Sequence, residues 1–69
     1  MKAKQNRKLQ DALLFDSITA ARSELDRATL IFNELTDDNG VDYASYNLLA
    51  ARAKYSYLLK IAKEKNLSV

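Results

Sequence analysis

The sequence has no cysteine, histidine, proline or tryptophan, and it has a single glycine. The absence of cysteine excludes a disulfide and a thiolate metal site. The absence of histidine removes the commonest metal ligand and the commonest general base at neutral pH. A chain of 69 residues builds a marginal core unless something else stabilises it. Oligomerisation is the remaining device, so we expect an oligomer without a metal or other cofactor.

Long apolar runs are also missing, since no stretch approaches the roughly 20 apolar residues that cross a membrane. The basic start, MKAKQNRKLQ, does not lead into an uninterrupted apolar segment, so it does not resemble a signal peptide. Residues 1–15 could lie on a membrane surface, but Asp11 and Asp16 oppose binding to anionic lipid. We therefore expect a cytoplasmic protein that does not bind membranes.

The residues that are present have the composition of a folded domain, with 48% hydrophobic and 29% charged residues. Glycine and proline are absent from residues 1–39, and seven apolar residues there follow a 4-3-4-3-4-3 spacing. This coiled-coil-like spacing places all seven on one face of a helix. They are Leu14, Ile18, Ala21, Leu25, Ala28, Phe32 and Leu35.

A second apolar stripe with the same spacing follows in the second half of the chain. It consists of Ala44, Leu48, Ala51, Tyr55, Leu58 and Ala62. The two stripes predict one all-α domain, residues 1–69. Within it we expect a basic arm at 1–8, a helix at about 8–37, a turn at 37–41 and a helix at about 42–66.

The stretch TDDNGVD at residues 36–42 lies between the stripes and could be a calcium loop or a simple chain reversal. With Gly40 as the glycine of an EF-hand loop, Leu35 and Tyr46 take the first and twelfth positions, where calcium requires carboxylates. The pattern therefore does not favour a calcium site.

A chain reversal explains each residue of this stretch. Gly40 can take the left-handed conformation that ends a helix, and Asp42 can cap the amides of the next helix. Val41 and Tyr46 have the spacing of a hydrophobic staple. The expected product is an antiparallel two-helix hairpin.

The two stripes fit one register of this hairpin. When the chain folds about residue 40, residues of one stripe face residues of the other. Most of these facing pairs combine a large with a small side chain, which allows close packing. The expected pairs are Phe32–Leu48, Ala28–Ala51, Leu25–Tyr55, Ala21–Leu58 and Ile18–Ala62.

The second helix carries more apolar surface than one partner helix can cover, and such a patch marks an interface. Tyrosine is well suited to an interface, because its ring packs against apolar side chains while its hydroxyl reaches the solvated edge. We predict that this face closes a homodimer, a four-helix bundle made of two hairpins. Docking of a different protein is the alternative. The predicted interface residues are Tyr46, Leu49, Ala50, Ala53, Tyr57 and Ile61.

Charged side chains gather by sign at the two ends of the hairpin. The basic residues at the open end are Lys2, Lys4, Arg7, Lys8, Lys60, Lys63 and Lys65. The acidic residues at the turn are Glu34, Asp37, Asp38 and Asp42. An antiparallel dimer would therefore bring basic ends beside acidic turns.

The basic end could contact the phosphates of RNA or DNA. No nucleic-acid-binding motif accompanies it, and a net charge of +2 is too small to indicate a polyanionic partner. A nucleic-acid-binding hairpin dimer is therefore the alternative function.

Catalytic groupings are not evident in the chain. Glu24 and Asp26 are two residues apart and lie on different parts of the helix surface, and Asp16, Thr29 and Tyr55 form no recognised nucleophile–base set. We therefore predict a non-enzymatic protein-interaction or adaptor module that acts through the second helix.

The stretch LLAARAKYSYLLKIAKEKNL, Leu48–Leu67, joins an alanine-rich turn to a Lys-Tyr pair and a leucine pair. In this stretch the chain resembles the C-terminal half of the YaaL-like proteins, which are small uncharacterised bacterial proteins of similar length. The resemblance implies a cytoplasmic protein of unknown function, with no catalytic residues to carry over. It lies in Ala51, Ala53, Lys54, Tyr55, Leu58, Leu59 and Ala62.

Overall fold

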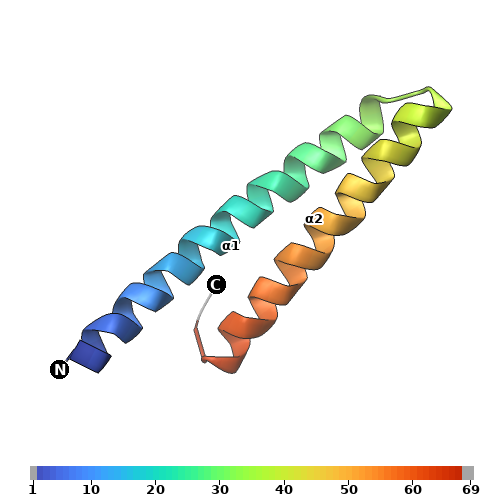
Figure 1. Cartoon of the computed structure of the whole chain (residues 1–69). Helices are drawn as coiled ribbons and strands as arrows, with labels where there is room; N and C mark the ends of the chain where they lie inside the picture. The colour runs from blue at the N-terminus through green and yellow to red at the C-terminus, as the bar shows by residue number, and fades with distance from the viewer. Residues whose placement is uncertain (1, 68–69) are drawn as a thin grey trace.

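Residues 2–67 form two helices joined by a short turn (Figure 1). A computed structural model describes the backbone of residues 2–67 and the side chains of residues 8–67. Helix α1 spans Lys2–Glu34 and helix α2 spans Asp38–Glu64, and no strand occurs in this part of the chain. The two helices run antiparallel, so the prediction of an all-α two-helix hairpin is confirmed.

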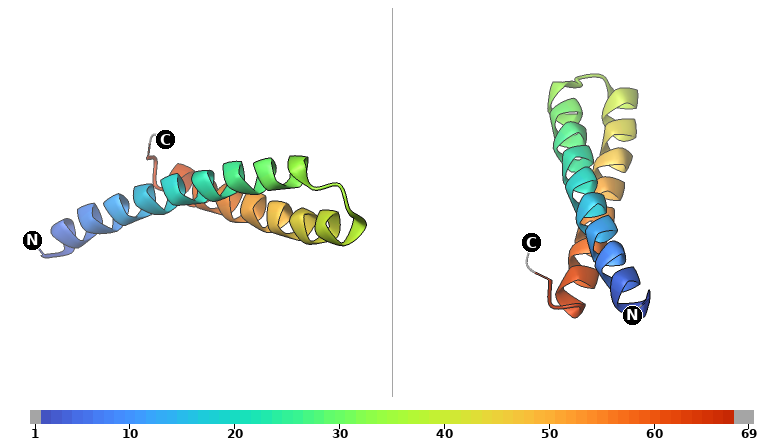
Figure 2. Two further views of the ribbon diagram at one scale, coloured as in Figure 1. Left: turned by 90° about the horizontal axis from the view of Figure 1, so that it is seen from above. Right: turned by 90° about the vertical axis from the view of Figure 1, so that its left-hand side faces the viewer.

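The hairpin is long and thin, with extents of 56 × 16 × 16 Å. Its radius of gyration is 15.6 Å, against about 11 Å for a compact domain of the same length. Helix α1 has 33 residues and α2 has 27, and the beginning of α1 extends past the end of α2 (Figure 2). Two helices in contact therefore leave much of each helix surface uncovered.

Helix α1 buries the stripe that its sequence predicts. All seven stripe residues are buried or half-buried, with Ile18 and Ala21 the most buried. Between residues 8 and 35, Asp11 is the one further side chain that is not exposed. Asp11 lies seven positions before Ile18, so it continues the stripe with a polar residue.

Helix α2 likewise buries its six stripe residues wholly or in part, with Ala44 and Ala62 fully buried. Val41 is half-buried and extends the stripe toward the turn, because it lies seven positions before Leu48. Leu59 is also half-buried, beside the stripe. The buried face of α2 is therefore slightly wider and longer than its spacing alone predicts.

The turn differs from the expectation. Helix α1 begins at Lys2, so the predicted arm at 1–8 was wrong in that residues 2–8 belong to the helix, and α1 ends at Glu34, three residues before its predicted end. Helix α2 begins at Asp38, four residues earlier than the predicted start near Asp42. The N-cap of α2 is Asp37, whose backbone is extended (φ −89°, ψ 148°) and whose Oδ2 accepts a hydrogen bond of 2.9 Å from the amide of Gly40. The expectation that Asp42 caps this helix was wrong, because Asp37 offers the same carboxylate one helical turn earlier.

The expected role of Gly40 was also wrong. Gly40 lies inside the first turn of α2, and no described glycine has a positive φ. The residue matters for its missing side chain, because a Cβ at this position would stand 2.7 Å from Oδ1 of Asp37. The expected hydrophobic staple between Val41 and Tyr46 required Val41 to lie just before the cap. Val41 instead lies one turn inside α2, so the expected staple was wrong.

The left-handed residue of the described chain lies at the other end of α2. Asn66 has a φ of 60°. Its amide donates to the carbonyl of Lys63 (3.0 Å), and the amide of Leu67 donates to the carbonyl of Ala62 (2.9 Å). These two bonds form a Schellman motif, which satisfies carbonyls left free at the end of a helix.

Among residues 8–67, whose side chains the structure describes, two ion pairs join the two halves of the hairpin. Lys54 Nζ lies 3.3 Å from Glu24 Oε1, and Lys65 Nζ lies 3.5 Å from Asp11 Oδ1. Lys65, the C-cap of α2, follows Leu58 by seven positions, and Asp11 precedes Ile18 by seven, so the second pair continues both stripes with charged residues.

Candidate interaction surface

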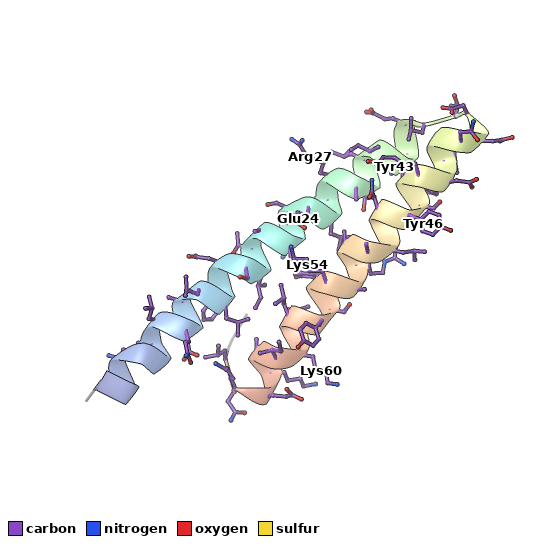
Figure 3. The ribbon with its side chains drawn as sticks, in the orientation of Figure 1. Glu24, Arg27, Tyr43, Tyr46, Lys54 and Lys60 are labelled. Atoms are coloured by element: carbon purple, nitrogen blue, oxygen red, sulfur yellow. The ribbon has the colours of Figure 1, made fainter. Side chains whose placement is uncertain are left out.

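The outward face of α2, defined by the six predicted interface residues, is largely uncovered. Tyr46, Tyr57 and Leu49 expose 76%, 63% and 59% of their surface, and Ile61 is half-buried. Figure 3 shows the Tyr46 side chain pointing away from α1. This exposure agrees with the surplus of apolar surface that the sequence predicts. The exposed members are Tyr46, Leu49, Ala50, Ala53 and Tyr57.

Tyr43 is a further exposed aromatic residue, with 67% of its surface accessible. It lies seven positions before Ala50, and Tyr57 lies seven positions after Ala50. A spacing of seven returns to nearly the same side of a helix, so these three residues form one line along α2. The sequence placed Tyr43 at the start of the predicted second helix but not on its outward face, although its spacing of seven from Ala50 was a usable signal.

Next to this line, a groove of about 360 Å³ runs between the two helices. Its apolar lining comes from Ala28 and Ile31 of α1 and from Ala44, Ala50 and Ala51 of α2. Ala28 and Ala51 form one of the predicted layers, and their small side chains leave space between the helices. The groove therefore begins at the helix contact and reaches the exposed line of α2 at Ala50.

The polar lining of the groove consists of Glu24, Arg27, Asn47 and Lys54. Glu24 and Lys54 point toward one another across it (Figure 3), with both Glu24 oxygens 3.3 Å from Lys54 Nζ. Both side chains are about half exposed, so the pair is solvated and its stabilisation is small. The groove is thus an apolar hollow with charged and amide groups at its rim.

Helix α1 adds exposed apolar side chains that sequence reasoning missed. Ile31 lines the groove and is 44% exposed, and Leu13 and Leu30 are exposed more fully. The 4-3 stripe directed attention to the buried face of this helix. Ile31 lies three positions after Ala28 of that stripe, so the two side chains are neighbours on the helix surface and Ile31 borders the helix contact.

The basic end is exposed where its side chains are described. Lys8, Lys60, Lys63 and Lys65 are all exposed, and Lys65 is paired with Asp11. The side chains of the other three predicted basic contacts lie outside the described residues; these are Lys2, Lys4 and Arg7. One lysine of the proposed cluster therefore already has a carboxylate partner.

The acidic turn functions in the fold as a helix cap. The Asp37 carboxylate accepts a hydrogen bond from the Gly40 amide. Asp38 lies in the first turn of α2, where a negative charge interacts favourably with the helix dipole. Among the described residues, no three potential metal ligands of the Asp, Glu, Cys or His type come together. The carboxylates at the turn are thus spread over a solvated surface.

The remaining side-chain hydrogen bond of the described residues is local. The Thr29 hydroxyl donates to the carbonyl of Leu25 at 2.8 Å, within α1. Glu24, considered as a candidate carboxylate, faces Lys54. These bonds support the helices, and they assemble no pair of a nucleophile and a base.

Hydropathy gives one further fact about the described helices. Neither α1 nor α2 combines the length with the apolar content that crossing a membrane requires.

The comparisons with known proteins identify a family. The model of a family described as "Protein of unknown function (DUF2508)" matches residues 1–69. No curated protein and no solved structure matches the chain. Because the family match spans the whole sequence, this two-helix chain belongs to the DUF2508 family of proteins of unknown function.

Proposed function

We propose that the protein is a non-enzymatic interaction module that pairs with itself into a four-helix bundle through the outward face of α2. The observation that carries the proposal is the row of exposed tyrosine, leucine and alanine residues on that face. A contiguous apolar patch on a small protein marks an interaction site. A second hairpin offers a matching face, because every copy carries the same one.

The total surface of the chain supports the proposal. Its accessible area is 5759 Å², whereas a compact monomer of 7.8 kDa exposes about 4,400 Å². The excess exceeds the roughly 800 Å² that each partner buries in an interface of standard size. A dimer can therefore form while the hairpin still exposes as much surface as an ordinary monomer.

The thin core supports it as well. Four apolar residues of the described chain are buried, and three of them are alanines; they are Ile18, Ala21, Ala44 and Ala62. Alanine buries little area, and apolar burial contributes roughly 25 cal/mol per Å². A chain of this size gains most by burying further side chains against a second copy.

The resemblance to the YaaL-like proteins supports the rest of the proposal. It agrees with membership of a family of unknown function. It implies a cytoplasmic location and supplies no catalytic residues. We therefore place the protein in the cytoplasm, in a role exerted by binding.

Two glutamate substitutions test the proposed interface. Tyr57→Glu places a charge on the outward face, where burial of an unpaired charge is costly. Thr19→Glu adds the same charge at an exposed position of α1, away from the outward face of α2 and from the groove. We expect Thr19→Glu to sediment as the wild type does and Tyr57→Glu to sediment as a monomer. Equal masses for the two variants would contradict the proposal.

Nucleic-acid binding at the basic end is the alternative. It would use exposed lysines such as Lys8, Lys60 and Lys63, although the pairing of Lys65 with Asp11 weakens it. Binding to phosphates must weaken steeply as the salt concentration rises, because the release of counterions from the nucleic acid is then less favourable. Retention of cellular RNA at low salt that is lost in a Lys60→Gln, Lys63→Gln variant would favour this alternative over self-association as the function.

A further inference from the structure

We propose that two copies of the chain pair antiparallel along α2, with Ala50 of each copy at the two-fold axis. In this arrangement Tyr57 of one copy lies against Tyr43 of the other. The proposal rests on the proposed self-association and adds its orientation and register.

The line formed by Tyr43, Ala50 and Tyr57 has the symmetry that such a pair requires. A two-fold axis at Ala50 brings together residues equally far from it on opposite sides, so Tyr43 meets Tyr57 at both ends. All three residues are exposed. The small Ala50 allows the two helices to approach closely at the axis, and the paired rings can pack edge to face on either side.

The groove gives Tyr57 of the second copy an apolar surface to cover. The groove includes Ala44 and Ile31, and Ala44 is next to Tyr43 in α2. Ile31 is 44% exposed in the single hairpin. A tyrosine ring seated there would cover Ile31, while Asn47 at the rim can bond to its hydroxyl.

The charges favour the antiparallel orientation. Asp37, Asp38 and Asp42 at the turn are exposed, and so are Lys8 and Lys63 at the open end. An antiparallel pair places the acidic turn of each copy beside the basic end of the other. A parallel pair would gather like charges at both ends, which opposes association.

A distance measurement between two spin labels tests the orientation without altering the proposed contact. The chain has no cysteine, so Lys60→Cys provides one labelling site per copy. Lys60 is exposed and points away from α1 (Figure 3). With a rise of 1.5 Å per residue, labels ten residues from the axis lie roughly 30 Å apart in the antiparallel pair. In a parallel pair they would lie within about 10–20 Å, because packed helix axes are 8–10 Å apart.

The outcomes separate this inference from the proposed function. A dimer by sedimentation with labels roughly 30 Å apart supports both. A dimer with closely spaced labels overturns the antiparallel pairing and leaves the self-association standing. If the labelled protein and the unlabelled wild type are both monomeric, the antiparallel pairing and the self-association are both overturned.

Cross-linking tests the register. Tyr43→Cys and Tyr57→Cys chains, each checked for helicity by circular dichroism, are treated with a short bis-maleimide singly and as a mixture. We expect a covalent dimer from the mixture and none from either variant alone. Cross-linking of each variant alone, with no increase in the mixture, would overturn the pairing of Tyr43 with Tyr57.

Discussion

At the scale of single residues, the start of α2 depends on one carboxylate and one missing side chain. Asp37 caps the helix by accepting from the Gly40 amide at 2.9 Å. The same carboxylate occupies the space into which a Cβ at position 40 would project, with Oδ1 at 2.7 Å. The cap and the glycine are therefore coupled.

The first prediction concerns this coupling. Asp37→Ala should lower the free energy of unfolding by about 1 kcal/mol, the usual effect of removing a cap. In that background, Gly40→Ala should stabilise by about 0.5–1 kcal/mol, because alanine favours a helix more than glycine does. With Asp37 present, Gly40→Ala should raise the free energy of unfolding much less, because the new Cβ displaces the Asp37 carboxylate.

Urea unfolding of the four proteins at one fixed concentration measures this cycle. The account requires that the effect of Gly40→Ala depend on Asp37. Strict additivity of the two changes would mean that the carboxylate and the glycine are not coupled.

A second residue-scale prediction concerns Asn66, which has a φ of 60° in the Schellman motif. Asn66→Gly should leave stability unchanged or raise it slightly, because glycine takes this conformation without a steric cost. Asn66→Val should lower it by about 1 kcal/mol, since a β-branched residue resists positive φ. Thermal unfolding of both variants checks the order, and a Val variant as stable as the Gly variant would contradict it.

At the scale of the helices, the spacing of apolar residues was the feature of the sequence that predicted the structure best. It predicted which residues α1 and α2 bury, because only one face of each helix can meet the other. The turn was less predictable, since Asp37 and Asp42 are equally good caps by residue type. The position of Val41 in the buried stripe, seven before Leu48, would have favoured the earlier start at Asp38.

The outward face of α2 was predictable for a similar reason. A helix that is apolar on two sides must leave one side uncovered by a single partner. The groove and Ile31 were not predictable, because they depend on how closely Ala28 and Ala51 let the helices approach. Tyr43 was predictable from its spacing of seven before Ala50, but it was not included in the predicted interface.

A third prediction compares how much the apolar stripe and the Glu24–Lys54 ion pair contribute to the free energy of unfolding. Ile18 is 6% exposed, and Ile18→Ala should destabilise by about 2–4 kcal/mol. Glu24→Gln removes one partner of a solvated ion pair and should have an effect below about 1 kcal/mol. Unfolding in urea ranks the two. A larger effect for Glu24→Gln would show that the ion pair, and not the stripe, holds the helices together.

At the scale of the whole molecule, the elongated hairpin has four buried apolar residues among those described, and it leaves large apolar side chains such as Tyr46, Leu49 and Tyr57 exposed. In the proposed dimer, pairing with a second copy covers the outward face of α2 and adds to the same core. Stability and association are then one process, so the melting temperature depends on protein concentration.

A fourth prediction follows from this dependence. Each tenfold increase in the concentration of the wild type should stabilise the folded dimer by about 1.4 kcal/mol of dimer, and the melting temperature should rise. Tyr57→Glu should melt lower and with no such dependence. Circular dichroism melts over a hundredfold range of concentration measure both.

Sedimentation equilibrium of the wild type at micromolar concentration tests the central claim most directly. The account predicts a species of twice the chain mass of 7.8 kDa, which dissociates when Tyr57 is replaced by glutamate. A wild type that sediments at 7.8 kDa at every concentration, with a melting temperature that does not change, would contradict it.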